Sequence, residues 1–167
     1  MAKWSADLQF YTIGYEGADL FDFLATLKHA EVSLLVDIRE LPASRRKGFS
    51  KNALRENLES VGIQYIHLRD LGDPKEGRLA ARMGKFNDFR RIFYNHMNKE
   101  EAKNGIIEVL ELINNYIVCL LCYERSPNNC HRSIVSEFII KESGAKANHI
   151  GVRAGFAEES RERISAG

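Results

Sequence analysis

Apolar residues along the chain fall into two patterns that alternate with each other. Short runs rich in β-branched and aromatic residues, which favour strands, occupy residues 8–13, 32–38, 63–67, 116–121 and 146–150. Apolar residues spaced three or four apart, which favour helices, occupy residues 20–27, 50–61, 86–97, 100–113 and 133–143. The alternation predicts an α/β fold, a single three-layer domain over residues 1–167 with a mostly parallel sheet of about five strands flanked by helices.

Two segments depart from this alternation. Residues 69–85 are rich in charged residues, glycine and proline, and predict a long loop. The residues beyond Gly151 are charged and predict a tail or a frayed helix.

The charge of the chain is balanced, with 24 Lys and Arg against 23 Asp and Glu and a net charge of +1. A balanced chain has no overall attraction to nucleic acid or to a membrane surface, so any such contact needs a local patch. No apolar run reaches the ~18 residues of a membrane span, and the first residues do not resemble a signal peptide. We therefore expect a cytoplasmic protein that makes no membrane contact.

The chain has three cysteines. Cys119 lies inside an apolar run and is expected in the core. An odd number of cysteines, one of them apolar in context, indicates reduced cytosolic thiols rather than a disulfide framework.

The segment 122–133 gathers two thiols, a carboxylate, an imidazole and two guanidiniums between a predicted strand and a predicted helix. Open α/β sheets bind ligands at such a junction, where helix N–H groups favour anions and thiolates. Cys122 or Cys130 is therefore a candidate nucleophile. His131 and Arg132 would stabilise the thiolate, and Glu124 would orient the imidazole. The alternative is that both cysteines only pack.

A metal site is a further alternative for the same segment. Cys122, Cys130 and His131 are suitable zinc ligands, and His67 stands at another strand end. Seven residues separate the two cysteines, however, whereas zinc ligand pairs are usually two to four residues apart. We therefore expect no cofactor, with zinc as the alternative.

Two other strand ends bring polar residues to the same edge of the sheet. Asp37 and Arg39 lie two apart after a buried run, so they face one side and can pair or share a ligand. Tyr15 and Glu16 follow the first strand and add a ligand-binding aromatic ring and a carboxylate. Asp37, Glu16 and the carboxylate at position 124 are the candidate general bases, although each can instead form a structural ion pair.

A basic segment follows at residues 44–51. Its cations, Arg45, Arg46, Lys47 and Lys51, predict contacts with phosphate, and Phe49 could stack on a base. The alternative is a solvated charged surface.

The ordered motifs together resemble the domain-of-unknown-function 488 family. The resemblance covers roughly residues 9–150 and rests on IGYEG at 13–17, LVDIR at 35–39, P-x-SR at 42–45, FS at 49–50, Y-x-HL-x-x-LG at 65–72 and C-x-E-x-x-P-x-x-CHR at 122–132. It implies a compact α/β domain whose motif residues cluster at one site.

A weaker similarity links the order of elements to rhodanese-like sulfurtransferases and related phosphatases. In those proteins the loop after the cysteine is short and wraps around an anion. Here nine residues separate Cys122 from Arg132, so the similarity is one of fold only.

These observations favour an enzyme that acts on a phosphate-bearing substrate, either a nucleotide or a nucleic acid. The basic segment would hold phosphate, and Arg39 with Arg132 would complete the anion site. One alternative is a non-catalytic nucleic-acid-binding module that uses the arginine-rich loop. Another is a metal-stabilised interaction domain.

Overall fold

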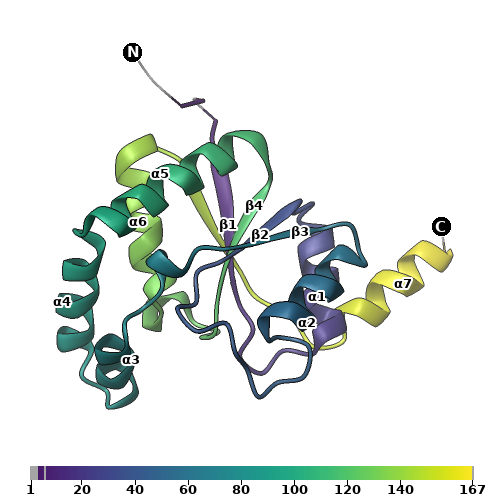
Figure 1. Ribbon diagram of the computed structural model, residues 1–167. Coiled ribbons are helices and arrows are strands. Elements are labelled where there is room, and N and C mark those ends of the chain that lie inside the picture. Colours follow the sequence, from purple (N-terminus) through teal and green to yellow (C-terminus); the bar gives the residue numbers. More distant parts are fainter. Residues whose placement is uncertain (1–3, 6, 167) are drawn as a thin grey trace.

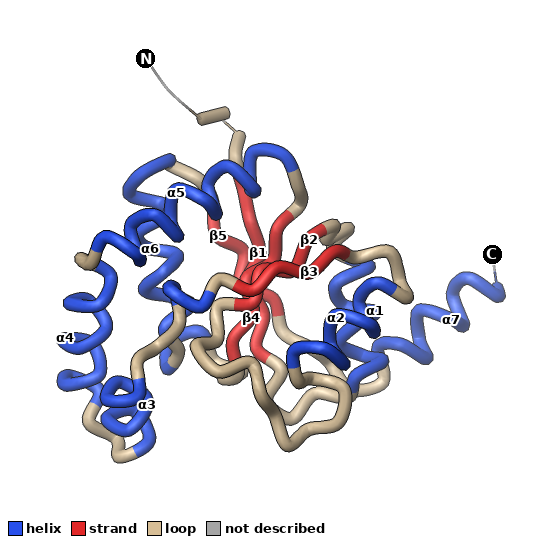
Figure 2. Tube along the Cα trace, in the orientation of Figure 1, coloured by secondary structure: helices blue, strands red, loops and turns tan. Residues whose placement is uncertain are grey.

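Five parallel strands form one sheet at the centre of the molecule (Figures 1 and 2). They are β1 (Gln9–Gly14), β2 (Leu34–Asp37), β3 (Gln64–His67), β4 (Val118–Cys122) and β5 (Lys146–Ile150), in the order β3-β2-β4-β1-β5. The structure is a computed structural model and describes residues 4–5 and 7–166. It confirms the predicted α/β fold. The prediction about the first residues of the chain falls partly on residues outside that description.

Helices cover both faces of the sheet (Figure 1). On one face lie α1 (Leu20–His29) and α2 (Lys51–Glu59), with α7 (Phe156–Ala166) packed on α1. On the other lie α4 (Phe86–Met97), α5 (Glu100–Asn115) and α6 (His131–Ser143), with α3 (Lys75–Arg82) packed on α4. None of the helices within the described ranges is long and apolar enough to cross a membrane.

The prediction of a long loop over residues 69–85 is wrong, because α3 occupies much of it. This helix buries only Gly77 and Ala80, and charged residues dominate its sequence. It is short, and Leu79, Ala80 and Ala81 are its only clearly apolar residues, too few to reveal a helical period in the sequence. Its position depends on packing against α4. The charged C-terminal segment is helical in α7, in agreement with the prediction.

The inner strands β2 and β4 are buried on both faces, which accounts for their continuous apolar runs. Leu34 and Val36 of β2 pack among the helices α4–α6, whereas the intervening Leu35 packs with α1 and α2. Cys119 of β4 lies fully buried in that second cluster, where sequence placed it.

The register of the sheet brings the polar strand ends together. Gly14 at the end of β1 lies opposite Cys122 at the end of β4, and Asp37 lies opposite both Leu121 and His67. The residues that follow these strands therefore emerge at one edge, where parallel sheets place their ligand sites.

Gly14 allows the chain after β4 to cross the end of β1. A Cβ atom at this position would lie 1.8 Å from the carbonyl oxygen of Glu124 and 2.5 Å from Nη1 of Arg132. The crossing is further held by the amide of Glu16, which donates to the carbonyl of Tyr123 at 2.8 Å. Only glycine fits here without moving the loop that follows β4.

We expect Gly14→Ala to lower the free energy of unfolding by about 3 kcal/mol, because the methyl group must displace backbone rather than a flexible side chain. Urea unfolding monitored by circular dichroism measures this. Gly151→Ala is the matched control, since no atom lies within 4 Å of a Cβ there, and it should change stability by less than about 0.5 kcal/mol. Equal stability of the two variants would contradict the close approach.

Candidate functional site

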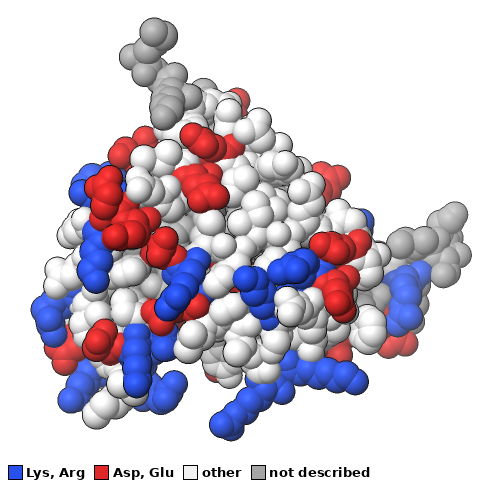
Figure 3. Space-filling model, viewed as in Figure 1, with Lys and Arg blue, Asp and Glu red and all other residues white. Residues whose placement is uncertain are grey.

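A pocket of about 650 Å³ lies at the carboxyl edge of the sheet. Its walls come from the ends of β1, β2 and β4, from α3 and from the start of α4. They include Tyr15, Arg39, Glu40, Arg45, Arg46, Asp73, Arg78, Arg82, Phe86, Phe89, Tyr123, Glu124 and His131. Figure 3 shows Lys and Arg side chains along the lower edge of the molecule, the end at which α3 and the loops after β1 and β2 lie in Figure 1. Basic side chains therefore line the pocket together with aromatic and acidic ones.

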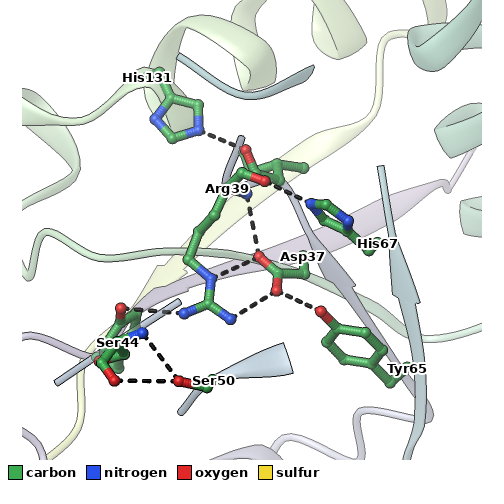
Figure 4. Close-up of polar contacts among 9 residues, drawn as sticks. Asp37, Arg39, Ser44, Ser50, Tyr65, His67 and His131 are labelled. Carbon is green, nitrogen blue, oxygen red and sulfur yellow. Dashed lines mark hydrogen bonds and ion pairs between the residues drawn. The ribbon is translucent and has the colours of Figure 1, made fainter. Parts of the chain in front are cut away.

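A buried ion pair joins Asp37 to Arg39, which lines the pocket (Figure 4). Oδ1 of Asp37 accepts from the backbone amide and from Nε of Arg39, at 3.1 and 2.9 Å. Oδ2 accepts from Nη2 of Arg39 at 2.8 Å and from the hydroxyl of Tyr65 at 2.6 Å. Nη1 of Arg39 donates to the hydroxyl of Tyr15 at 3.1 Å. Both carboxylate oxygens of Asp37 are thus hydrogen-bonded, and Arg39 is the member of the pair that lines the pocket.

The ion pair shifts the pKa values of the groups around it. Burial alone would lower the pKa of Arg39, but the hydrogen bonds and the negative charge of Asp37 outweigh it and raise that pKa. Burial and the charge of Asp37 likewise raise the pKa of Tyr65. The network therefore keeps Arg39 cationic and Tyr65 a neutral hydrogen-bond donor.

Two histidines hold the backbone beside this pair. Nε2 of His131 lies 2.9 Å from the carbonyl oxygen of Ile38, and Nε2 of His67 lies 2.6 Å from that of Arg39. Burial lowers the pKa of His131 to about 4, so its ring is neutral at pH 7. In this geometry the ring supports the strand end, and the predicted role of His131 as a cation beside a thiolate stays a prediction for the reduced cysteines.

Cys122 and Cys130 form a disulfide. This overturns the prediction that the cysteines are reduced, and it reflects the fold: β4 ends where α6 begins, so positions eight apart meet. Both are buried and neither lines the pocket. The nucleophile role remains a prediction for the reduced pair. Cys119 is a free thiol whose pKa burial raises.

Arg132 is fully buried and does not line the pocket. Its Nη1 and Nη2 donate to the carbonyls of Glu124 and Arg125, at 2.8 and 2.9 Å. Nη1 also lies 3.4 Å from Sγ of Cys122. In this arrangement the guanidinium holds the loop after β4, so Arg132 does not join Arg39 in the pocket wall as sequence suggested.

The structure divides the basic segment in two. Arg45 and Arg46 line the pocket, whereas Lys47 and Lys51 do not. Arg46 also donates to the carbonyl of Ala18.

Two other residues of this segment are structural. Phe49 is buried and stacks on Tyr15 with ring centroids 4.7 Å apart, so it supports the pocket wall and offers no face to a base. Ser50 accepts from the amide of Ser44 at 3.0 Å and donates to its carbonyl at 3.1 Å, which fixes the loop between them.

The two predicted carboxylates after β1 and β4 have different positions. Glu124 lines the pocket, and burial raises its pKa. Glu16 is exposed outside the pocket and accepts from the amide of Arg125 at 3.0 Å. Glu16 therefore joins two loops, and Glu124 is the one that lines the pocket.

Sequence reasoning missed Asp73. It is buried in the pocket wall, and its Oδ1 has no hydrogen-bond partner in the described part of the chain. Burial, followed by the negative charge of Glu124, raises the pKa of Asp73 to about 7, although Arg78 opposes the shift and Glu40 adds to it. Asp73 directly follows the Leu71-Gly72 motif, and this position could have marked it as a site residue. It was not singled out because residues 69–85 were predicted to form a loop.

Gly72 and Gly77 set the position of Asp73. A Cβ on Gly72 would lie 2.3 Å from the amide nitrogen of Glu40, and a Cβ on Gly77 would lie 2.0 Å from Oδ1 of Asp73. Arg78 closes the arrangement by donating to the carbonyl of Asp73 at 2.7 Å and pairing with Glu40 at 3.2 Å. The start of α3 is thereby packed against the chain after β2.

We expect the stability contributed by Asp73 to fall as pH rises. The carboxyl group of Asp73 has a pKa of about 7 in the folded protein against 3.8 in an unperturbed chain, so the folded protein binds the carboxyl proton more tightly. The resulting gain in stability is therefore complete below pH 3.8 and is lost as the pH rises through 7. Relative to Asp73→Asn, the wild type should lose about 2–3 kcal/mol of unfolding free energy between pH 4 and pH 8. Urea unfolding at both pH values tests this, and the neighbouring exposed Asp70→Asn should show no such trend.

The comparisons with known proteins identify a family. The family model described as "Domain of unknown function DUF488" matches residues 19–139, from the start of α1 into α6, and confirms the resemblance seen in the motifs. No curated protein and no solved structure matches the chain, so the similarity to rhodanese-like domains stays a prediction. Because the family match spans most of the sequence, the chain belongs to the DUF488 family.

Proposed function

We propose that this protein is an enzyme that carries out general acid–base chemistry on a small phosphate-bearing substrate, a nucleotide, bound in the pocket. One observation carries the proposal. Cationic side chains from two separate elements and a buried carboxyl group that titrates near neutrality line the same cavity of about 650 Å³. Pockets of this size hold small molecules, and perturbed carboxyl groups are enriched at catalytic sites.

Arg45 and Arg82 are the proposed phosphate ligands. They come from the loop after β2 and from α3, and both line the pocket. Both are exposed, and neither has a hydrogen-bond or ion-pair partner among the described residues. Arg39 and Arg78, by contrast, are paired with Asp37 and Glu40. Two unpaired guanidiniums on one cavity suit a phosphate, which each can bind through two N–H groups.

Aromatic side chains would hold the base of the nucleotide. Tyr123 is 45% exposed and Phe86 is 44% exposed, and both line the pocket. Tyr123 is steadied by an edge-on contact with Tyr15, whose ring centroid is 5.3 Å away. An exposed ring on a supported wall offers a face on which a planar base can stack.

Asp73 would transfer the proton. A group whose pKa lies near 7 is present in both protonation states at neutral pH, as a general acid or base requires. Glu124 shares the pocket wall and would act as its partner. Acid–base chemistry is favoured over attack by a cysteine because the disulfide occupies both candidate nucleophiles.

The second candidate is a nucleic-acid-binding module. It is favoured by the exposed Lys47 and the half-buried Lys51, which extend the basic surface beyond the pocket. A polymer would use this outer surface together with Arg45, whereas a nucleotide would use only the cations of the cavity. The two functions therefore differ in which cations matter.

We expect Arg45→Gln and Arg82→Gln each to weaken the binding of AMP about tenfold, since each removes a charge-assisted contact worth about 1.4 kcal/mol. Lys47→Gln and Lys51→Gln remove the same charge outside the pocket and should leave the affinity within about twofold. Isothermal titration calorimetry measures all four. Equal losses in the four variants would favour the nucleic-acid module, and absence of AMP binding by the wild type would refute the proposed substrate class.

A further inference from the structure

The corner between β4 and α6 holds three groups that are known metal ligands. The two sulfur atoms of Cys122 and Cys130 and a carboxylate oxygen of Glu124 all lie within 4.8 Å of one another. Ligands of one zinc ion, at about 2.0–2.3 Å from the metal, lie roughly 3.3–3.8 Å apart in a tetrahedral site. The three groups are therefore close enough to share one ion once the sulfur atoms separate.

The surroundings of the two sulfur atoms suit thiolates. Nη1 of Arg132 donates toward Sγ of Cys122 at 3.4 Å, and the backbone amide of Arg132 donates to Sγ of Cys130 at 3.5 Å. Cys130 is also the N-cap of α6, where the helix dipole favours negative charge. N–H donors and a buried cation lower the cost of deprotonating a thiol, and metal binding requires that deprotonated form.

We propose that, when reduced, Cys122 and Cys130 bind one zinc(II) ion together with Glu124. The charges balance, because two thiolates and one carboxylate offset the ion and the guanidinium of Arg132. Sulfur ligands select zinc over magnesium or calcium, which prefer oxygen. The disulfide seen in the structure is then the oxidised, metal-free form of the same site.

The conversion between the two forms is a two-electron reaction. A dithiol reductant passes two electrons and two protons to the disulfide, which yields two protein thiols and the disulfide of the reductant. Zinc binding then releases the two thiol protons. The disulfide carries no charge, and in the zinc form the two thiolates are balanced by the charge of the ion.

The ligand set differs from the one that the sequence suggested, in that Glu124 takes the place of His131. The ring of His131 has its Nε2 on the carbonyl of Ile38, and its Nδ1 lies 3.7 Å from Sγ of Cys130. It is thus suited to support the site from outside. Glu124 also lines the pocket, and three protein ligands leave a fourth position for water or a substrate oxygen.

The test measures zinc binding by the purified full-length protein under anaerobic conditions, against a chromophoric chelator. The reduced protein should bind one equivalent of zinc, and the oxidised protein none at that affinity. Cys122→Ser and Cys130→Ser should each weaken binding at least about 100-fold, and Glu124→Gln about tenfold. The matched control Cys119→Ala, which alters a core thiol outside the site, should bind as the wild type does.

Cobalt(II) provides a second readout, because thiolate coordination produces a sulfur-to-cobalt charge-transfer band. The reduced wild type should show this band and the oxidised protein should lack it. Comparing two redox states of one sequence keeps the test valid even where a serine variant fails to fold. Equal zinc affinity of the reduced and oxidised proteins, or no binding by the reduced protein, would refute the site. Neither result depends on nucleotide binding.

Discussion

The buried ion pair between Asp37 and Arg39 is the interaction on which the geometry of the pocket depends. Both oxygens of Asp37 are occupied, and the carbonyl groups beside the pair are held by His67 and His131. Breaking a buried pair by removing one partner typically costs about 3–5 kcal/mol, because the remaining charge is left uncompensated. The pair thus sets the direction in which the chain leaves β2, and with it the position of the arginine-bearing loop.

A second constraint acts on the opposite wall. The chain after β4 crosses Gly14, is held by two carbonyl contacts to Arg132, and is closed by the disulfide. This loop carries Tyr123 and Glu124 into the pocket. Because the disulfide bounds the loop that presents Glu124, the redox state of the cysteines and the chemistry of the pocket are linked through a few residues.

The sequence allowed the sheet and most helices to be predicted, because strands buried on both faces read as continuous apolar runs. It also indicated that Arg39, Arg45 and Glu124 share one edge, since they follow neighbouring strand ends. It did not indicate the burial of Arg132, because the sequence alone does not distinguish an arginine that binds backbone carbonyls from one that binds an anion. The role of Asp73 depends on packing by α3, a short and mostly polar helix, and therefore required the structure.

The measurement that tests the central claim most directly is turnover by the wild type and by Asp73→Asn, with nucleotides screened for release of phosphate or base. We expect the wild type to turn over at least one nucleotide, and Asp73→Asn to bind AMP normally but to lose about 10²–10⁴-fold in rate. The wild-type rate should also change through pH 7, where Asp73 titrates. Full activity of Asp73→Asn, with an unchanged pH profile, would contradict the account.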